Sequence, residues 1–80
     1  MTYVYILRSI SAQDQFYIGC SNDLRARVKA HNSGKSPHTK KFRPWKIAFY
    51  AAFASKEKAI QFEPYLKSGS GAVFRTRHLL

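Results

Sequence analysis

Two short runs of aromatic and β-branched residues near the start of the chain constrain its fold more than any other feature. They are Tyr3–Leu7 and Phe16–Cys20, and the polar stretch 9–15 between them is typical of a turn. Because such residues favour extended backbone, the two runs predict a β-hairpin. Side chains alternate along a strand, so a pairing that places Tyr5 and Tyr17 on one face places the aliphatic residues on the other.

The segment after this hairpin carries the signals of a helix. Ser21 and Asn22 are candidate N-caps, and Asp23 then places an acid in the first turn, where the helix macrodipole favours it. The residues that follow at helical spacing are Leu24, Val28 and His31. The sequence Asn-Ser-Gly at 32–34 is a typical stop signal, so we expect the first helix to end there.

The second half of the chain predicts one more strand and one more helix. The apolar run Trp45–Phe53 suits a strand, and we expect it at the centre of the sheet. Ser55 then caps a helix from Lys56 to about Lys67, in which Pro64 is expected to cause a kink. The inward-facing stripe of this helix is expected to consist of Ala59, Ile60, Glu63 and Leu66. A glycine- and serine-rich stretch at 68–71 ends it and leaves a short basic tail.

The order of these elements predicts the fold class. Strand, strand, helix, basic loop with or without a short helix, strand and helix indicate an α/β fold, with a small three-stranded, mainly antiparallel sheet flanked by helices. The chain has 80 residues, so we expect a single domain over 1–80. No stretch approaches the roughly 20 apolar residues of a membrane span. With no signal peptide expected and only one cysteine, Cys20, we expect a cytoplasmic protein without a disulfide or a multi-cysteine zinc site.

Charge is the strongest indication of a partner. The chain has 14 Lys and Arg against 4 Asp and Glu, and its net charge of +10 favours a polyanion. The basic residues are spread along the chain rather than along one amphipathic helix, so nucleic acid is a better candidate than a membrane surface. Phe42 and Trp45 lie among them and could stack on bases, although Trp45 is as well explained as core. The expected nucleic-acid-binding residues are Arg25, Lys29, Lys35, Lys40, Lys41, Arg43 and Lys46.

Only one carboxylate is a candidate for chemistry. Asp14 lies in a predicted loop, and Asp23 and Glu57 lie in first turns of helices, where the macrodipole explains them. Glu63 lies on an inward stripe, where an acid is costly unless it is paired or bound to a cation. Two interpretations remain open for Glu63, an ion pair with a basic residue and a Mg²⁺ ligand. A single usable acid argues against a two-metal site held by the protein.

Two basic side chains and two tyrosines complete the candidates. Arg27 and His31 are four residues apart and share a helix face. Arg27 could bind a phosphate or be one more solvated cation, and His31 could transfer a proton or cap the helix. Tyr5 and Tyr17, taken singly, are explained by strand packing.

Taken together, these residues resemble a known family. Tyr3-Val4-Tyr5, followed by Tyr17-Ile18-Gly19, resembles the paired signature of GIY-YIG nucleases. Arg27, His31 and Glu63 follow at positions that match the family's arginine, its His-or-Tyr position and its metal-binding glutamate. The stretches 38–45 and 66–71 are similar to the small standalone bacterial branch, which is often labelled excinuclease-like after the DNA-repair nuclease that shares the domain.

The resemblance implies a metal-dependent endonuclease that uses Mg²⁺ or Mn²⁺. Tyr17, or a water that it holds, would be deprotonated so that the water attacks phosphorus, with Tyr5 positioning the site and His31 assisting the proton transfer. Arg27 and a cation on Glu63 would stabilise the charged phosphorane, and Gly19 would allow a close approach. We expect a monomer that favours DNA over RNA with little sequence preference. A non-catalytic nucleic-acid-binding module and a basic protein of a ribonucleoprotein are the alternatives.

Overall fold

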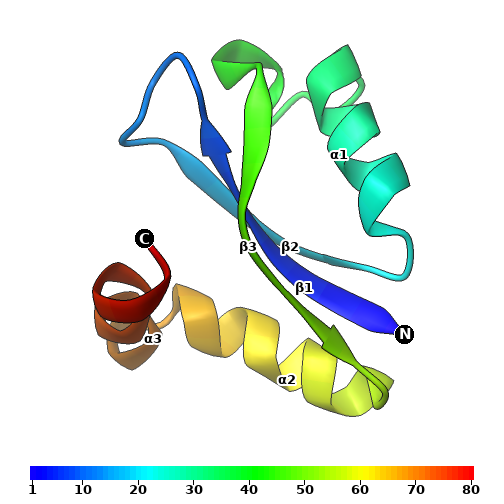
Figure 1. Ribbon diagram of the computed structural model, residues 1–80, viewed down its shortest axis with the longest axis vertical. Helices are drawn as coiled ribbons and strands as arrows, with labels where there is room; N and C mark the ends of the chain where they lie inside the picture. The colour runs from blue at the N-terminus through cyan, green and yellow to red at the C-terminus, as the bar shows by residue number, and fades with distance from the viewer.

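The computed structural model describes residues 1–80 and contains a three-stranded sheet with helices on both faces (Figure 1). Its elements follow the predicted order, which confirms the α/β fold class. The strands are β1 (Thr2–Ser9), β2 (Phe16–Ser21) and β3 (Trp45–Phe53). The helices are α1 (Leu24–Ser33), α2 (Lys56–Lys67) and α3 (Gly69–Phe74), with a short 3-10 turn at Lys40–Phe42 and a final π-helical turn at Arg75–Leu79.

The sheet has the strand order β2-β1-β3, and both pairs are antiparallel. The expectation that Trp45–Phe53 forms the central strand is therefore wrong, because β1 occupies the centre and β3 is an edge. A central strand buries both of its faces, and the run Val4–Leu7 of β1 is completely buried. In β3 only Trp45 is buried, whereas Ile47 and Tyr50 remain exposed along this edge strand.

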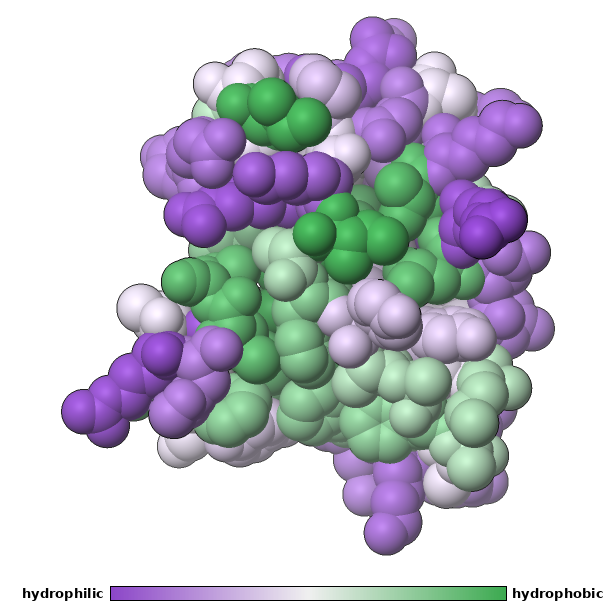
Figure 2. Space-filling view, viewed as in Figure 1, coloured by the Kyte–Doolittle hydropathy of each residue, from purple (hydrophilic) through white to green (hydrophobic).

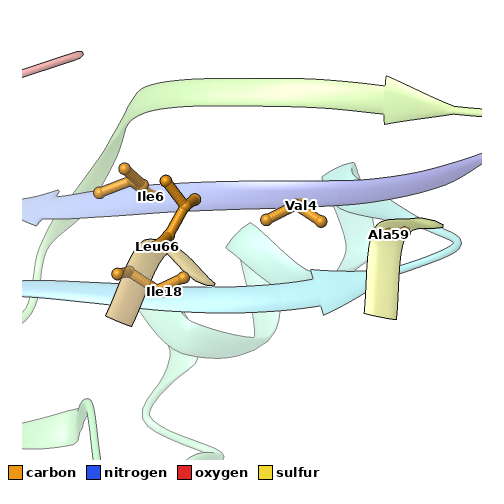
Figure 3. Close-up of a cluster of buried hydrophobic side chains, with 5 residues drawn as sticks. All are labelled: Val4, Ile6, Ile18, Ala59 and Leu66. Atoms are coloured by element: carbon orange, nitrogen blue, oxygen red, sulfur yellow. The ribbon is translucent and has the colours of Figure 1, made fainter. Parts of the chain in front are cut away.

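The alternation predicted for the hairpin is confirmed. Val4, Ile6 and Ile18 lie on one face of the sheet and pack against Ala59 and Leu66 of α2 (Figure 3). Tyr5, Leu7 and Trp45 lie on the other face, together with Tyr17, and contact Leu24 and Val28 of α1. The hairpin register pairs Tyr5 with Gly19 and Leu7 with Tyr17. The two tyrosines of the motif therefore point into the layer between the sheet and α1.

The helix ends follow the expected chemistry with one correction. The acid Asp23 is itself the N-cap of α1, where its carboxylate accepts a hydrogen bond of 3.0 Å from the Ala26 N–H, and it is not a first-turn residue. Gly34 ends α1 with a left-handed φ of 82°, as the stop signal predicted. Ser55 caps α2 through the Lys58 N–H.

The inward stripe of α2 differs from the predicted one at a single position. Ala59 and Leu66 are completely buried, and Phe62 packs beside them, whereas Ile60 is 54% exposed. The positions 59, 62 and 66 keep a spacing of three and four residues, and Ile60 lies just outside that stripe. Glu63 lies at its margin, with its side chain 24% exposed. Pro64 lies inside α2, which runs to Lys67 as expected.

The Gly/Ser stretch ends α2 at Lys67, as expected, but a new helix follows where only a short basic tail was expected. Ser68 caps α3 by accepting a hydrogen bond from the Gly71 N–H, and the π-helical turn follows directly. Arg75 holds this segment against the sheet, because its guanidinium lies 4.6 Å from the centre of the Phe16 ring and donates to the Leu66 carbonyl. Glycines are poor helix formers, so this helix depends on its packing rather than on its composition.

Gly71 provides a test of that packing. A Cβ at this position would lie 1.7 Å from the Tyr65 carbonyl oxygen, which is a backbone atom and cannot turn away. We expect Gly71→Ala to lower the free energy of unfolding by about 1–3 kcal/mol. The matched control is Gly69→Ala in the same helix, where a Cβ would have no other atom within 4 Å. We expect this variant to be as stable as the wild type or slightly more stable. Urea denaturation of both variants measures the difference, and equal stability would contradict the tight contact.

No helix of the structure is both long and apolar enough to cross a lipid bilayer.

Candidate active site

The Tyr5 side chain lies at the centre of the site. Tyr5 is in the middle of the central strand and is completely buried. Its ring passes over Gly19, the residue opposite it on β2, so that a Cβ at position 19 would lie 2.4 Å from the Tyr5 hydroxyl oxygen. The close approach expected at Gly19 is therefore that of a side chain, and the glycine makes the space that Tyr5 occupies.

His31 meets Tyr5 from the end of α1. A hydrogen bond of 3.2 Å joins the Tyr5 hydroxyl to Nε2 of His31, and a second of 2.8 Å joins Nδ1 to the hydroxyl of Thr39. The Tyr17 ring lies beside this pair, with its centre 4.8 Å from the centre of the His31 ring. Tyr17 is half-buried, and its hydroxyl makes no hydrogen bond to the protein. The structure therefore brings Tyr5, Tyr17 and His31 together.

A second layer of contacts holds His31 in place, and sequence reasoning missed it. Thr39 is buried, and its carbonyl accepts a 2.8 Å hydrogen bond from the Trp45 indole N–H. The Asn32 side chain accepts from the Trp45 backbone N–H and donates to the Trp45 carbonyl. Trp45 is 4% exposed, which contradicts its suggested use as a stacking surface and assigns it to the core. Thr39 and Asn32 carried no spacing signal, because their partners lie far away in the sequence or belong to the backbone.

Burial keeps the central groups uncharged at neutral pH. Burial, together with the neighbouring Tyr17, raises the pKa of Tyr5 to about 12 in spite of the opposing effect of Arg27, with smaller contributions from Glu63 and Cys20. Burial, together with Arg27, lowers the pKa of His31 below its usual 6.5. Tyr5 is therefore a protonated phenol and His31 a neutral imidazole, which is the form that can accept a proton.

Arg27 and Glu63 border this cluster from opposite sides. Arg27 is exposed on α1, and its positive charge lowers the pKa of both Tyr5 and His31. Glu63 comes from α2, on the other face of the sheet. Its negative charge raises the pKa of Tyr5 and that of the Cys20 thiol in β2. Burial followed by Glu63 raises the pKa of that thiol. Tyr5 is thus the residue on which Tyr17, Arg27 and Glu63 all act, with the cation on the α1 side of the sheet and the carboxylate on the α2 side.

Glu63 fits one metal ion of the oxygen-binding kind. No group of three or more His, Cys, Asp and Glu side chains is arranged to hold a metal by protein ligands alone. Mg²⁺ commonly takes one or two carboxylates and keeps several waters, and a lone carboxylate meets that need. Glu63 also forms the ion pair that the sequence allowed, with Lys67 at 3.5 Å. The Lys67 side chain is more than half exposed and can turn away, so the two interpretations are compatible.

The basic residues expected to bind nucleic acid are all accessible. Arg25 and Lys29 are on α1, and the others lie on the segment from the end of α1 to the start of β3. The seven exposed side chains are those of Arg25, Lys29, Lys35, Lys40, Lys41, Arg43 and Lys46. Lys41 lies over the Phe42 ring at 5.6 Å.

The lowered pKa of His31 predicts how stability depends on pH. His31 has a pKa of about 6.5 in the unfolded chain and a lower pKa in the folded protein. As pH falls, His31 of the unfolded state therefore binds a proton first. The free energy of unfolding should therefore be unaffected by His31 above about pH 7.5 and should fall as pH drops below about 6.5. Urea denaturation across this range should show the loss for the wild type and for His78→Gln, an exposed histidine, but a smaller loss for His31→Gln. A His31→Gln profile identical to the wild type would contradict the neutral, buried imidazole.

Comparison with known proteins identifies the family. A family model for the GIY-YIG catalytic domain matches residues 1–77. The UPF0213 protein YazA of Bacillus subtilis is 44% identical over 55 residues, which are 68% of this chain and 56% of that protein. The solution structure of a UPF0213 protein from Bacillus halodurans matches with a TM-score of 0.56 and 32% identity, covering 96% of this chain and 84% of the other. The chain belongs to the GIY-YIG nuclease-domain family, as its motifs predicted.

A relative of named activity also matches. The structure-specific endonuclease subunit SLX1 of Debaryomyces hansenii is 39% identical over 83 residues, which cover 95% of this chain. The chain spans about half the length of YazA and about a quarter of that SLX1 protein, at 56% and 23%.

Proposed function

We propose that the protein is a metal-dependent endonuclease that hydrolyses phosphodiester bonds in nucleic acid, DNA in preference to RNA, with little sequence preference. The observation that carries this proposal is the cluster of Tyr5, Tyr17 and His31 between Arg27 and Glu63. Hydrolysis of a phosphodiester needs a held water, a proton acceptor and positive charge around the phosphorus, and this cluster contains a candidate for each. Membership of the GIY-YIG family and the net charge of +10 support the same substrate class.

Tyr17 holds the attacking water. Its hydroxyl is free of protein partners and points from the edge strand β2, where a substrate can reach it. The water gives up a proton, its oxygen bonds to phosphorus, and the bond from phosphorus to the leaving oxygen breaks. The proton passes by way of the Tyr5 hydroxyl, which gives its own proton to the neutral imidazole of His31 as it takes that of the water, and the leaving oxygen is protonated from solvent. Tyr5 is protonated before and after this transfer and positions His31 through their hydrogen bond.

Arg27 and Glu63 supply the charge that the transition state needs. The exposed guanidinium of Arg27 can bind two phosphate oxygens in a forked contact. Glu63 would hold a Mg²⁺ or Mn²⁺ ion, which when bound supplies Lewis-acid stabilisation of the leaving oxygen. Lys67, released from Glu63, becomes one more cation at this edge of the sheet.

The rival function is a non-catalytic nucleic-acid-binding module. The exposed basic residues are sufficient for such a role, and Glu63 is already paired with Lys67. Substitution of Glu63 distinguishes the two functions. Cleavage by a nuclease depends on Glu63, whereas nucleic-acid binding by a non-catalytic module hardly does.

The test is a cleavage assay on labelled single-stranded, duplex and branched DNA and on RNA, with Mg²⁺ or with a chelator, and with binding measured in parallel. We expect cutting that requires Mg²⁺ and is faster on DNA. Binding without cutting in any metal would establish the binding module instead. Metal-independent binding that prefers structured RNA would indicate a protein of a ribonucleoprotein.

A further inference from the structure

A groove separate from the tyrosine–histidine cluster opens between α1 and β3. It has a volume of about 610 Å³. Its floor contains Tyr3, Ile47 and Tyr50 of the sheet, and Val28 lies on its α1 side. In the space-filling view, apolar side chains gather over the middle of this face, where β3 runs in Figure 1, and hydrophilic side chains border them (Figure 2). Because β3 is an edge strand, no further strand pairs with it on this side of the sheet.

The groove exposes an aromatic surface that the fold does not use. Tyr50 is 54% exposed, and its ring centre lies 6.3 Å from that of Tyr3 in a tilted pair. Ile47 is also exposed. A tyrosine that serves only the core is buried, as Tyr5 is, whereas an accessible tyrosine beside cations is typical of surfaces on which bases stack.

The net charge of the groove lining is positive, because it contains two cations and one acid. Arg25 and Lys29 are four residues apart on α1, line the groove and are exposed. The one acid in the lining, Asp23, is committed to the N-cap of α1 through the Ala26 N–H. The surface therefore suits an occupant that combines planar apolar rings with negative charge, and a strand of nucleotides has both.

The position of the groove relates it to the site of cutting. Tyr50 pairs across the sheet with Tyr5, and Tyr3 lies two residues from Tyr5 along β1, a distance of about 7 Å. The same helix carries Arg25 and Lys29 toward the groove and His31 toward Tyr17. A nucleic-acid strand that crosses α1 would reach both.

We propose that this groove binds an unpaired nucleotide next to the bond that is cut, with its base stacked on Tyr50 and its phosphates on Arg25 and Lys29. The position of this nucleotide relative to the cut rests on the proposed nuclease function. Bases inside a duplex are stacked on one another and cannot lie on Tyr50, so the groove favours substrates with a single-stranded segment, such as a flap or a branch, over uninterrupted duplex.

Binding measurements in a chelator test the groove without any dependence on cutting. Fluorescence anisotropy compares a labelled single-stranded DNA, an RNA of the same sequence and a blunt duplex. We expect Tyr50→Ala to weaken single-strand binding roughly tenfold, which is the loss of one stacked base, and to leave duplex binding unchanged. Tyr50→Phe keeps the ring and should bind as the wild type does. The matched control Ile60→Ala removes an equally exposed apolar side chain from α2 and should have no effect.

Charge and self-association complete the test. Arg25→Ala and Lys29→Ala should each reduce the salt dependence of binding by about one phosphate contact. The DNA and RNA arms show which strand the groove accepts. An equal loss on single strand and duplex, or no loss in Tyr50→Ala, would overturn the proposal even if the protein cuts DNA. A dimer in sedimentation that Tyr50→Ala dissociates would also overturn it, because the occupant would then be a second copy of the chain.

Discussion

Glu63→Gln is expected to lower the rate of metal-dependent cleavage by about three orders of magnitude, because a bound metal ion contributes several kcal/mol of transition-state stabilisation. Glu63 is the one carboxylate that acts on the pKa of Tyr5, and glutamine keeps its shape while removing its charge. The ion pair with Lys67 is partly solvated and contributes at most about 1 kcal/mol, so the variant should fold normally. Nucleic-acid binding in a chelator should be unchanged or slightly tighter, since one negative charge is lost.

Glu57→Gln is the matched control for this change. Glu57 is on the same helix and is exposed, and it interacts with Ser55 in the first turn. The same chemical substitution there should leave cleavage unchanged. Initial cleavage rates of the two variants at saturating Mg²⁺ give the comparison. A wild-type cleavage rate in Glu63→Gln would show that Glu63 takes no part in catalysis.

Tyr17→Phe is expected to lower the cleavage rate by about two to four orders of magnitude, the range of a lost group in proton transfer. The substitution deletes one oxygen that makes no hydrogen bond to the protein, and the ring can keep its contact with His31. Stability and binding should therefore remain at wild-type levels.

Tyr65→Phe controls for the loss of a tyrosine hydroxyl elsewhere. Tyr65 is an exposed residue of α2, away from the cluster, and this variant should cut at the wild-type rate. Single-turnover rates separate the chemical step from product release for both proteins. If Tyr17→Phe cuts as fast as Tyr65→Phe, the attacking water is held by another group.

The parts of the fold that were predictable depend on local periodicity. Alternation in the first two strands placed Tyr5 and Tyr17 on one face and the aliphatic residues on the other, as observed. Helix caps at Ser55 and Gly34 followed from residue chemistry that operates within a few positions. The family motif was recognisable because its residues keep a fixed order and spacing along the chain.

The parts that were not predictable depend on contacts between distant segments. Whether Trp45–Phe53 is a central or an edge strand is decided by what packs on its faces, and an apolar run alone does not contain that information. Thr39 supports His31 only because the loop after α1 folds back over the histidine. The helix α3 forms from glycine-containing sequence because Arg75 and Gly71 pack against α2 and β2.

In the proposed reaction, water attacks a phosphodiester with the help of a divalent cation. Its most direct test is digestion of DNA by the wild-type protein in water labelled with heavy oxygen, with and without Mg²⁺, followed by mass spectrometry of the products. We expect cleavage only with the metal, and one labelled oxygen in each new terminal phosphate. Tight binding of the same DNA with no product at any metal concentration, or product without the label, would contradict it.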